Sequence, residues 1–213
     1  MGHKHARGFR KLEGDEVARV AFPGASGEVT GSSYLLETAH ARVLFDCGLC
    51  QGERHSRAQN ERPFPFRARD LDMVVLTHAH VDHSGLIPKL VHDGFRGKIH
   101  ATLPGGELVG VLLRDSARIH EQDTKSENRR RQRHGKKPLE PLYEVADAER
   151  ALDKLVLHPF GTEDEIAPGL RVRFVRAGHI LGAASVEAWD KEETFECKLV
   201  FSGDLGRKRE PLL

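Results

Sequence analysis

The sequence predicts an α/β fold, in which strands and helices alternate along the chain and pack in layers. The chain has 213 residues, 38% of them apolar and 31% charged, which is enough for one sizeable buried core. The run 73–76 is continuously apolar, which is typical of a strand that is buried on both faces. The sequence contains no run of 18 apolar residues, so a transmembrane helix is not expected.

Glycine and proline separate the apolar runs of the first half of the chain, and this punctuation indicates four strands. They are expected at 17–22, 33–37, 42–45 and 73–76. A short helix should follow the fourth strand. Because proline lacks an amide hydrogen and fits only the first turn of a helix, Pro88 places the start of this helix near Ser84 or Gly85.

The rest of the chain continues the alternation, which indicates a layered α/β domain. A strand at 98–101 precedes a helix at 107–122, where apolar residues recur on one stripe. A second helix is expected at 145–155. Three strands follow, at 170–175, 185–189 and 198–201.

The strongest functional signal is the sequence THAHVDHSG, which begins directly after the apolar strand. Residues two apart in an extended segment point the same way, so His78 and His80 can bind one ion. The turn into the following helix can direct Asp82 and His83 at a second position nearby. Imidazole nitrogens and carboxylate oxygens are the ligands of zinc or a similar divalent metal. A packing role is the weaker interpretation, because clustered buried histidines need partners.

Three further residues of ligand type stand where other strands should end. Asp46, His179 and Asp204 each follow an apolar strand and lie next to, or close to, a glycine. Either aspartate alone could be a turn or cap residue, and His179 alone could be an ordinary loop histidine. Their shared position at strand ends is what makes all three candidates for one site.

These segments resemble the metallo-β-lactamase superfamily. The narrower likeness is to its β-CASP branch of RNA-processing nucleases, which includes relatives of the cleavage-and-polyadenylation endonuclease and of ribonuclease J. The segments that carry the likeness span nearly the whole chain: 22–36, 45–52, 76–86, 178–183 and 201–206. The metal motif is common to the superfamily, and the stretch FPGASGEVTGSSYLL at 22–36 is more discriminating.

The resemblance implies an αββα sandwich, present here as an incomplete N-terminal half. Residues 1–16 would be an N-terminal extension, 17–207 the metallo-β-lactamase-like domain, and 208–213 the start of a truncated β-CASP region. The β-CASP insert, the closing strands, the last ligand of the second zinc and a proton-donating histidine have no counterpart in this sequence. An N-terminal portion of a longer protein, or a fragment, is therefore expected.

The resemblance also implies roles for the candidate residues. His78, His80 and His179 would hold one Zn²⁺, Asp82 and His83 a second, and Asp204 would bridge the two. Asp46 would orient a ligand from behind by a hydrogen bond. Asp82 and Asp204 would be the catalytic carboxylates, acting with a hydroxide that the two zinc ions activate.

The expected reaction is hydrolysis of RNA, with single-stranded RNA as substrate. The formal charge of such a two-zinc site is +1, which favours an anionic substrate but does not separate phosphodiesters from β-lactams or thioesters. A small-molecule thioester, lactone or β-lactam hydrolase therefore stays open as an alternative. So does an inactive fragment that acts only as a binding module.

A basic run at 129–137 is the one segment that breaks the α/β pattern. Its two interpretations are a loop that contacts RNA phosphates and a solvated loop tip between helices, and the second is the commoner fate of an isolated basic run. The candidate phosphate contacts are Arg129, Arg130, Arg131, Arg133, Lys136 and Lys137.

Charge and cysteine content bear on the environment of the protein. The net charge of +1 argues against a binder whose whole surface is basic. Three cysteines cannot all pair, which favours a reducing, cytoplasmic location. Cys47 and Cys50 form a C-x-x-C pattern, for which small core thiols are the preferred interpretation over a redox or metal role. No membrane partner is expected, and a homodimer is compatible with a sequence that does not fix the oligomeric state.

Overall fold

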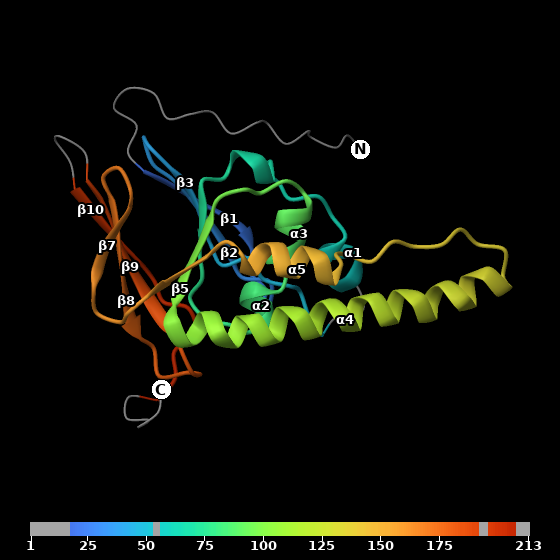
Figure 1. Cartoon of the computed structure of the whole chain (residues 1–213). Coiled ribbons are helices and arrows are strands. Elements are labelled where there is room, and N and C mark those ends of the chain that lie inside the picture. Colours follow the sequence, from blue (N-terminus) through green and yellow to red (C-terminus); the bar gives the residue numbers. More distant parts are fainter. Residues whose placement is uncertain (1–17, 53–55, 192–195, 208–213) are drawn as a thin grey trace.

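A computed structural model describes residues 18–52, 56–191 and 196–207 of the chain. Two β-sheets face each other, and the helices pack on the outer side of the first sheet (Figure 1). The first sheet is built, in spatial order, from β1 (Arg19–Gly24), β2 (Ser33–Glu37), β3 (Arg42–Phe45), β4 (Met73–Val75), β5 (Lys98–Thr102) and β6 (Leu155–His158). The second sheet has the order β10 (Glu196–Phe201), β9 (Ala184–Lys191), β8 (Leu170–Arg176) and β7 (Glu163–Ala167).

The direction of the strands places the chemistry of the molecule at one edge. Strands β3 to β6 run parallel, so the segments that follow their carboxyl ends gather at the same edge of the sheet. The pairs β1–β2 and β2–β3 are antiparallel, as are all the pairs of the second sheet. The helical elements are α1 (Ser56–Asn60), a 3₁₀ turn (Ala68–Asp70), α2 (Val81–Ser84), α3 (Ile87–His92), α4 (Leu103–Arg133) and α5 (Val145–Leu152).

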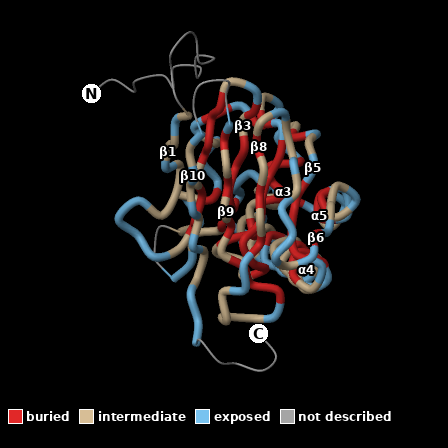
Figure 2. The backbone as a smooth tube through the Cα atoms, turned by 90° about the vertical axis from the view of Figure 1, so that its left-hand side faces the viewer, coloured by how far each residue is buried: buried red, intermediate tan, exposed pale blue. Residues whose placement is uncertain are grey.

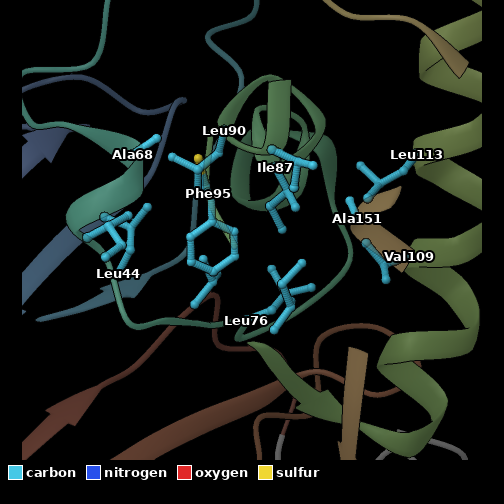
Figure 3. Packing of buried hydrophobic residues seen from close by; sticks show 14 of the residues in the cluster. Leu44, Ala68, Leu76, Ile87, Leu90, Phe95, Val109, Leu113 and Ala151 are labelled. Carbon is cyan, nitrogen blue, oxygen red and sulfur yellow. The ribbon is translucent and has the colours of Figure 1, made fainter. Parts of the chain in front are cut away.

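Two apolar clusters, one on each side of the first sheet, hold the layers together. Between the helices and the sheet, side chains such as Leu44, Leu76 and Phe95 pack into one cluster (Figure 3). Between the two sheets, Val75, Phe174 and Val186 belong to the other. The strands that lie between these clusters are buried on both sides (Figure 2), as the apolar run 73–76 predicts.

The layered α/β sandwich predicted from the sequence is confirmed for helices, first sheet and second sheet. Among the described residues no helix covers the outer face of the second sheet. None of the helices in the described part of the chain is long and apolar enough to cross a membrane. The predicted segments 1–16 and 208–213, and Val17 of the first predicted strand, lie outside the described residues.

The three helix predictions are wrong in their bounds. The short helix expected from Ser84 or Gly85 is two helices, α2 and α3, and Pro88 lies in the first turn of α3. The helix expected at 145–155 ends at Leu152, and Leu155 begins β6. The sequence pattern of alternating strands and helices did not predict the strands β6 and β7.

The helix predicted at 107–122 is α4, which runs from Leu103 to Arg133. The basic residues 129–133, expected in a loop, therefore form its last turns, while Lys136 and Lys137 do lie in the loop that follows. The segment after Gln122 is polar but contains no glycine or proline before Gly135, so nothing stops the helix. Gly135 has a φ of 64°, the left-handed conformation that ends many helices.

Candidate metal centre

The candidate site lies beyond the carboxyl end of β4, in the middle of the first sheet. The loop after β4 carries His78 and His80, and α2 follows it directly. This loop is fixed to its neighbours by backbone hydrogen bonds. The amide of Leu76 donates to the carbonyl of His100 on β5, and the amide of Ala184 at the start of β9 donates to the carbonyl of Thr77. Both sheets thus hold the segment that carries the first two histidines.

Four side chains from three separate segments of the sequence converge at this point. His78, His80, His179 and Asp204 each present a ligand atom, and these atoms lie within 4.8 Å of one another. Nδ1 of His80 is 3.2 Å from Nε2 of His78 and 3.1 Å from Nε2 of His179. Oδ2 of Asp204 is 3.4 Å from Nε2 of His179 and 3.9 Å from Nε2 of His78.

The chemistry of this donor set fits a divalent cation. Three imidazole nitrogens face one another, and one proton on Nδ1 of His80 can serve only one of its two neighbours. The remaining lone pairs and a carboxylate oxygen would repel each other without a positive charge between them. Nitrogen and oxygen donors at such spacing are those that zinc and similar metals use. The four residues therefore form a metal-binding group.

Asp46 lies behind this group and is completely buried. Its carboxylate accepts hydrogen bonds from the backbone amide and the hydroxyl of Thr77, both at 2.8 Å. It also lies 2.8 Å from Nδ1 of His83, which as the neutral donor leaves Nε2 of that ring free. The φ of Asp46 is 58°, a left-handed conformation that aspartate tolerates better than most residues.

Thr77 is a residue that the sequence reasoning missed. Its hydroxyl donates to Asp46 and lies 3.1 Å from Nδ1 of His78, from which it can accept. This arrangement presents Nε2 of His78 to the cluster as a lone pair. Asp46 thus orients two histidines, His83 directly and His78 through Thr77. The only signal in the sequence is the position of Thr77 immediately before the histidine motif.

The pKa values differ between the histidines of the site. Burial, together with the charges of His83, His80 and His179, lowers the pKa of His78 to about 2, so the ring stays neutral and able to bind a metal. Burial and His179 lower the pKa of His80. At His83 burial acts in the same direction, but the hydrogen bond and charge of Asp46, with the charges of Asp204 and Asp82, raise the pKa above its ordinary value.

The remaining predicted residues lie at different distances from the four-residue group. Nε2 of His83 is 3.3 Å from Oδ1 of Asp204, so the carboxylate of Asp204 faces both His83 and the group. Asp82 is in the first turn of α2, where its charge acts on His80 and His83, but it is not a member of the group. The predicted phosphate contacts lie at the far end of α4 and in the loop that follows it.

The three cysteines lie outside the metal-binding group and form no disulfide in the described part of the chain. Cys47 is buried, and burial raises the pKa of its thiol. A buried thiol of this kind is inert, which agrees with the preferred interpretation of Cys47 as a core residue.

The sequence of this chain is similar to part of the sequence of two proteins whose names state an activity. The chain is 36% identical over 195 residues to "Ribonuclease TTHA0252" of Thermus thermophilus, an alignment that covers 92% of this chain and 39% of that protein. It is 29% identical over 208 residues to "Transcription termination factor FttA" of Methanocaldococcus jannaschii, covering 95% of this chain and 29% of that protein. The chain thus spans less than half the length of either relative.

The fold has a counterpart among solved structures. The subclass B3 metallo-beta-lactamase MEM-A1, from a soil metagenome library, superposes with a TM-score of 0.50 at 18% identity, covering 87% of this chain and 62% of that one. At this identity the likeness concerns the fold alone. Residues 26–213 match the sequence pattern of the Metallo-beta-lactamase superfamily. With the metal-binding group at the expected strand ends, this match shows that the chain belongs to the metallo-beta-lactamase superfamily.

Proposed function

We propose that this chain is the metal-binding catalytic portion of a zinc-dependent ribonuclease of the β-CASP branch. The observation that carries the proposal is the convergence of His78, His80, His179 and Asp204 within 4.8 Å. The names of the two relatives, a ribonuclease and a transcription termination factor, support RNA as the substrate over a small molecule.

Two zinc ions are the proposed cofactors. His78, His80 and His179 would hold one ion, Asp82 and His83 the other, and Asp204 would lie between them. The distances support this assignment, because the two carboxylate oxygens of Asp204 lie 3.4 Å from His179 and 3.3 Å from His83. When bound, the ions would acidify a water and stabilise negative charge on a phosphate, which is the chemistry of phosphodiester hydrolysis.

The residues of the chain prepare the site before any ion binds. Asp46 and Thr77 fix the tautomers and ring orientations of His83 and His78, so these ligands need no reorganisation. The lowered pKa of His78 keeps that ligand unprotonated near neutral pH. Asp82 and Asp204 supply the negative charge of the site, and we propose them as its catalytic carboxylates.

A direct test is hydrolysis by the full chain loaded with zinc. Labelled single-stranded RNA should be cut in the presence of zinc and remain intact in EDTA. Elemental analysis should find close to two zinc ions per chain for a competent site, whereas one ion would fit a site that lacks its last ligand and none would fit an inactive fragment. His179→Ala should abolish cutting and lower the zinc content. His92→Ala is a matched control, because His92 lies on α3 with 59% of its side chain exposed.

The same experiment separates the alternatives. Zinc-dependent turnover of a β-lactam or thioester with intact RNA would favour a small-molecule hydrolase. Bound zinc without any hydrolysis would leave a binding module. We also propose a cytoplasmic location, on the basis of three cysteines outside any described disulfide. A homodimer remains a proposal for which sedimentation analysis is the test.

A further inference from the structure

The far end of α4 forms an arm that projects from the body of the protein. Thr124 is the last buried residue of α4, and nine further helical residues follow it. In Figure 1 this part of the helix extends beyond α5 and α1, and the chain then returns alongside it towards α5. We define the arm as residues 125–140.

The arm is held in a defined conformation by its own hydrogen bonds. The side chain of Asn128 donates to the carbonyl of Leu139 at 2.8 Å and accepts from the amide of Leu139 at 2.7 Å. The guanidinium of Arg131 donates to the carbonyl of Lys137 at 2.7 Å. These bonds tie the returning segment to the helix, so the two parts of the arm have a fixed arrangement.

The arm carries a large excess of positive charge. Its 16 residues contain seven lysines or arginines and two glutamates, a formal charge of +5, whereas the whole chain has +1. The remainder of the sequence is therefore net negative. Positive residues in the last turn of a helix do interact favourably with the helix dipole, as Arg130, Arg131 and Arg133 can here. That interaction does not account for Lys125, more than one turn earlier, or for Lys136 beyond the end.

A hollow of about 480 Å³ lies between the helix and the returning segment. It is lined by three cations, two amides and a proline: Lys125, Arg129, Lys136, Asn128, Gln132 and Pro138. The lining contains no carboxylate. Within the described residues, the nearest acidic partner of a lining cation is Glu121, 3.6 Å from the ammonium of Lys125. Cations and amide donors around an acid-free hollow match the charge and the hydrogen-bond acceptors of phosphates.

We propose that this hollow is a second RNA-binding site, which grips the phosphate backbone of a substrate away from the metal centre. The inference rests on the proposed ribonuclease function. The start of α4 is fixed near the metal centre, because the hydroxyl of Thr102 donates to the carbonyl of Gly182, three residues after His179. From Gly105 to Arg129 the helix rises about 36 Å.

The length of helix between Gly105, near the metal centre, and Arg129, at the hollow, determines which RNAs can use both sites. A stacked strand rises 3.4 Å per nucleotide, so about 11 nucleotides span the separation. RNAs much shorter than this can occupy the metal centre or the hollow, and longer RNAs can occupy both. Occupancy of both sites by one strand raises its affinity without any new contact at either site.

The test compares single-stranded RNAs of 6 and 24 nucleotides and of mixed sequence, with zinc present and with phosphorothioate linkages that resist cutting. The variant Lys125→Gln/Arg129→Gln/Lys136→Gln removes the three lining cations and keeps good helix formers. The control Arg69→Gln/Arg96→Gln/Lys98→Gln removes the same charge from three exposed residues. They lie near the amino ends of β4 and β5, at the edge of the first sheet opposite the metal centre. Circular dichroism melting shows that each variant folds.

The affinity for the 24-mer divided by the affinity for the 6-mer should fall at least about tenfold in the hollow variant. In the control variant we expect this ratio to stay unchanged. The salt slope for the 24-mer should decrease by about 2, at roughly 0.7 per lost phosphate contact. Equal losses in both variants would overturn the proposal. So would equally strong competition by polyglutamate of the same length, which would assign the hollow to an acidic protein segment.

The two proposals fail separately. Length-dependent binding that needs the hollow, without zinc-dependent cutting, would refute the ribonuclease function and keep the RNA site. Zinc-dependent cutting with no effect of the hollow on binding would refute the second site alone.

Discussion

Two groups of histidines in this protein use the same side chain in opposite ways. At the metal centre, ring nitrogens of His78, His80 and His179 face one another, in an arrangement that suits a shared cation. In the second group, Nδ1 of His158 lies 2.7 Å from the carboxylate of Asp164, and Nε2 of His158 lies 2.9 Å from Nδ1 of His100. Two neutral rings satisfy this second chain completely, since each donates one proton in the same direction.

The difference between the groups lies in where each chain of hydrogen bonds ends. The second group ends on Asp164 and leaves no lone pair facing another within the chain. At the metal centre the buried carboxylate of Asp46 takes the outward protons of His83 and, through Thr77, of His78. This leaves the inward nitrogens of these two rings without protons. The two groups therefore differ in whether a buried acceptor outside the cluster takes ring protons away from it.

The largest expected effect separates the two groups by function. His80→Ala should reduce zinc-dependent RNA hydrolysis by more than the 10–100-fold that loss of an outer-shell partner costs. It should also lower the zinc content. His158→Gln should leave zinc content and hydrolysis close to the wild-type values, because His158 touches no proposed ligand. A large loss of zinc in His158→Gln would remove the distinction between the groups.

The second prediction concerns pH and the group that does not bind metal. Burial, with the charge of His158, lowers the pKa of His100 to about 4. Between pH 6.5 and 4 the unfolded chain binds a proton at this residue and the folded chain does not, so stability should fall as pH is lowered through that window. The loss attributable to His100 is up to about 3 kcal/mol at 1.36 kcal/mol per pKa unit.

Urea unfolding in EDTA at several pH values measures this loss. The variant His100→Gln retains hydrogen-bonding capacity but does not titrate, so the pH dependence of its unfolding free energy should be shallower than that of the wild type by up to one proton. The same slope in both proteins would mean that the pKa of His100 is the same in the folded and the unfolded chain, and would contradict the lowered value.

The smallest effects compare the two carboxylates that end the hydrogen-bond chains. Asp46→Asn should weaken zinc binding by about 10–100-fold, because an amide cannot accept all the protons that Asp46 accepts. Asp164→Asn should leave zinc affinity unchanged and lower the free energy of unfolding by about 1 kcal/mol, because Asp164 is partly exposed and water can replace it. Competition with a zinc chelator measures the first quantity, and urea titration the second. Equal effects on zinc would contradict the roles given to the two residues.

The sequence was sufficient to predict the ligands that follow strands. His179 and Asp204 could be grouped with His78 and His80 because each follows the end of an apolar strand. Their strands, β8 and β10, both pair antiparallel with β9 and therefore end at the same edge of the second sheet. Thr77 could not be predicted, since its role depends on the register that brings its hydroxyl within 2.8 Å of Asp46. The second group was missed for the same reason, because His100 and His158 lie on neighbouring strands, and β6 was not predicted.

The length of α4 was the main error in the fold. The apolar stripe that indicates a helix marks only the part of α4 that packs against the body. Beyond Thr124 the helix has no core to face, and its continuation depends on good helix formers and on local pairs such as Glu127 with Arg130. A periodicity of apolar residues cannot report a helix that leaves the domain.

Because α4 is unbroken, it holds the hollow at a fixed distance from the start of the helix and at a fixed rotation about the helix axis. Each residue of a helix adds 1.5 Å and turns the chain by about 100°, so the number of residues between Gly105 and Arg129 sets both the reach and the facing of the hollow. A seven-residue insertion before Lys125 would add about 10 Å and keep nearly the same facing. A two-residue insertion would add only about 3 Å and turn the hollow to the opposite side, so orientation constrains this helix more tightly than length does.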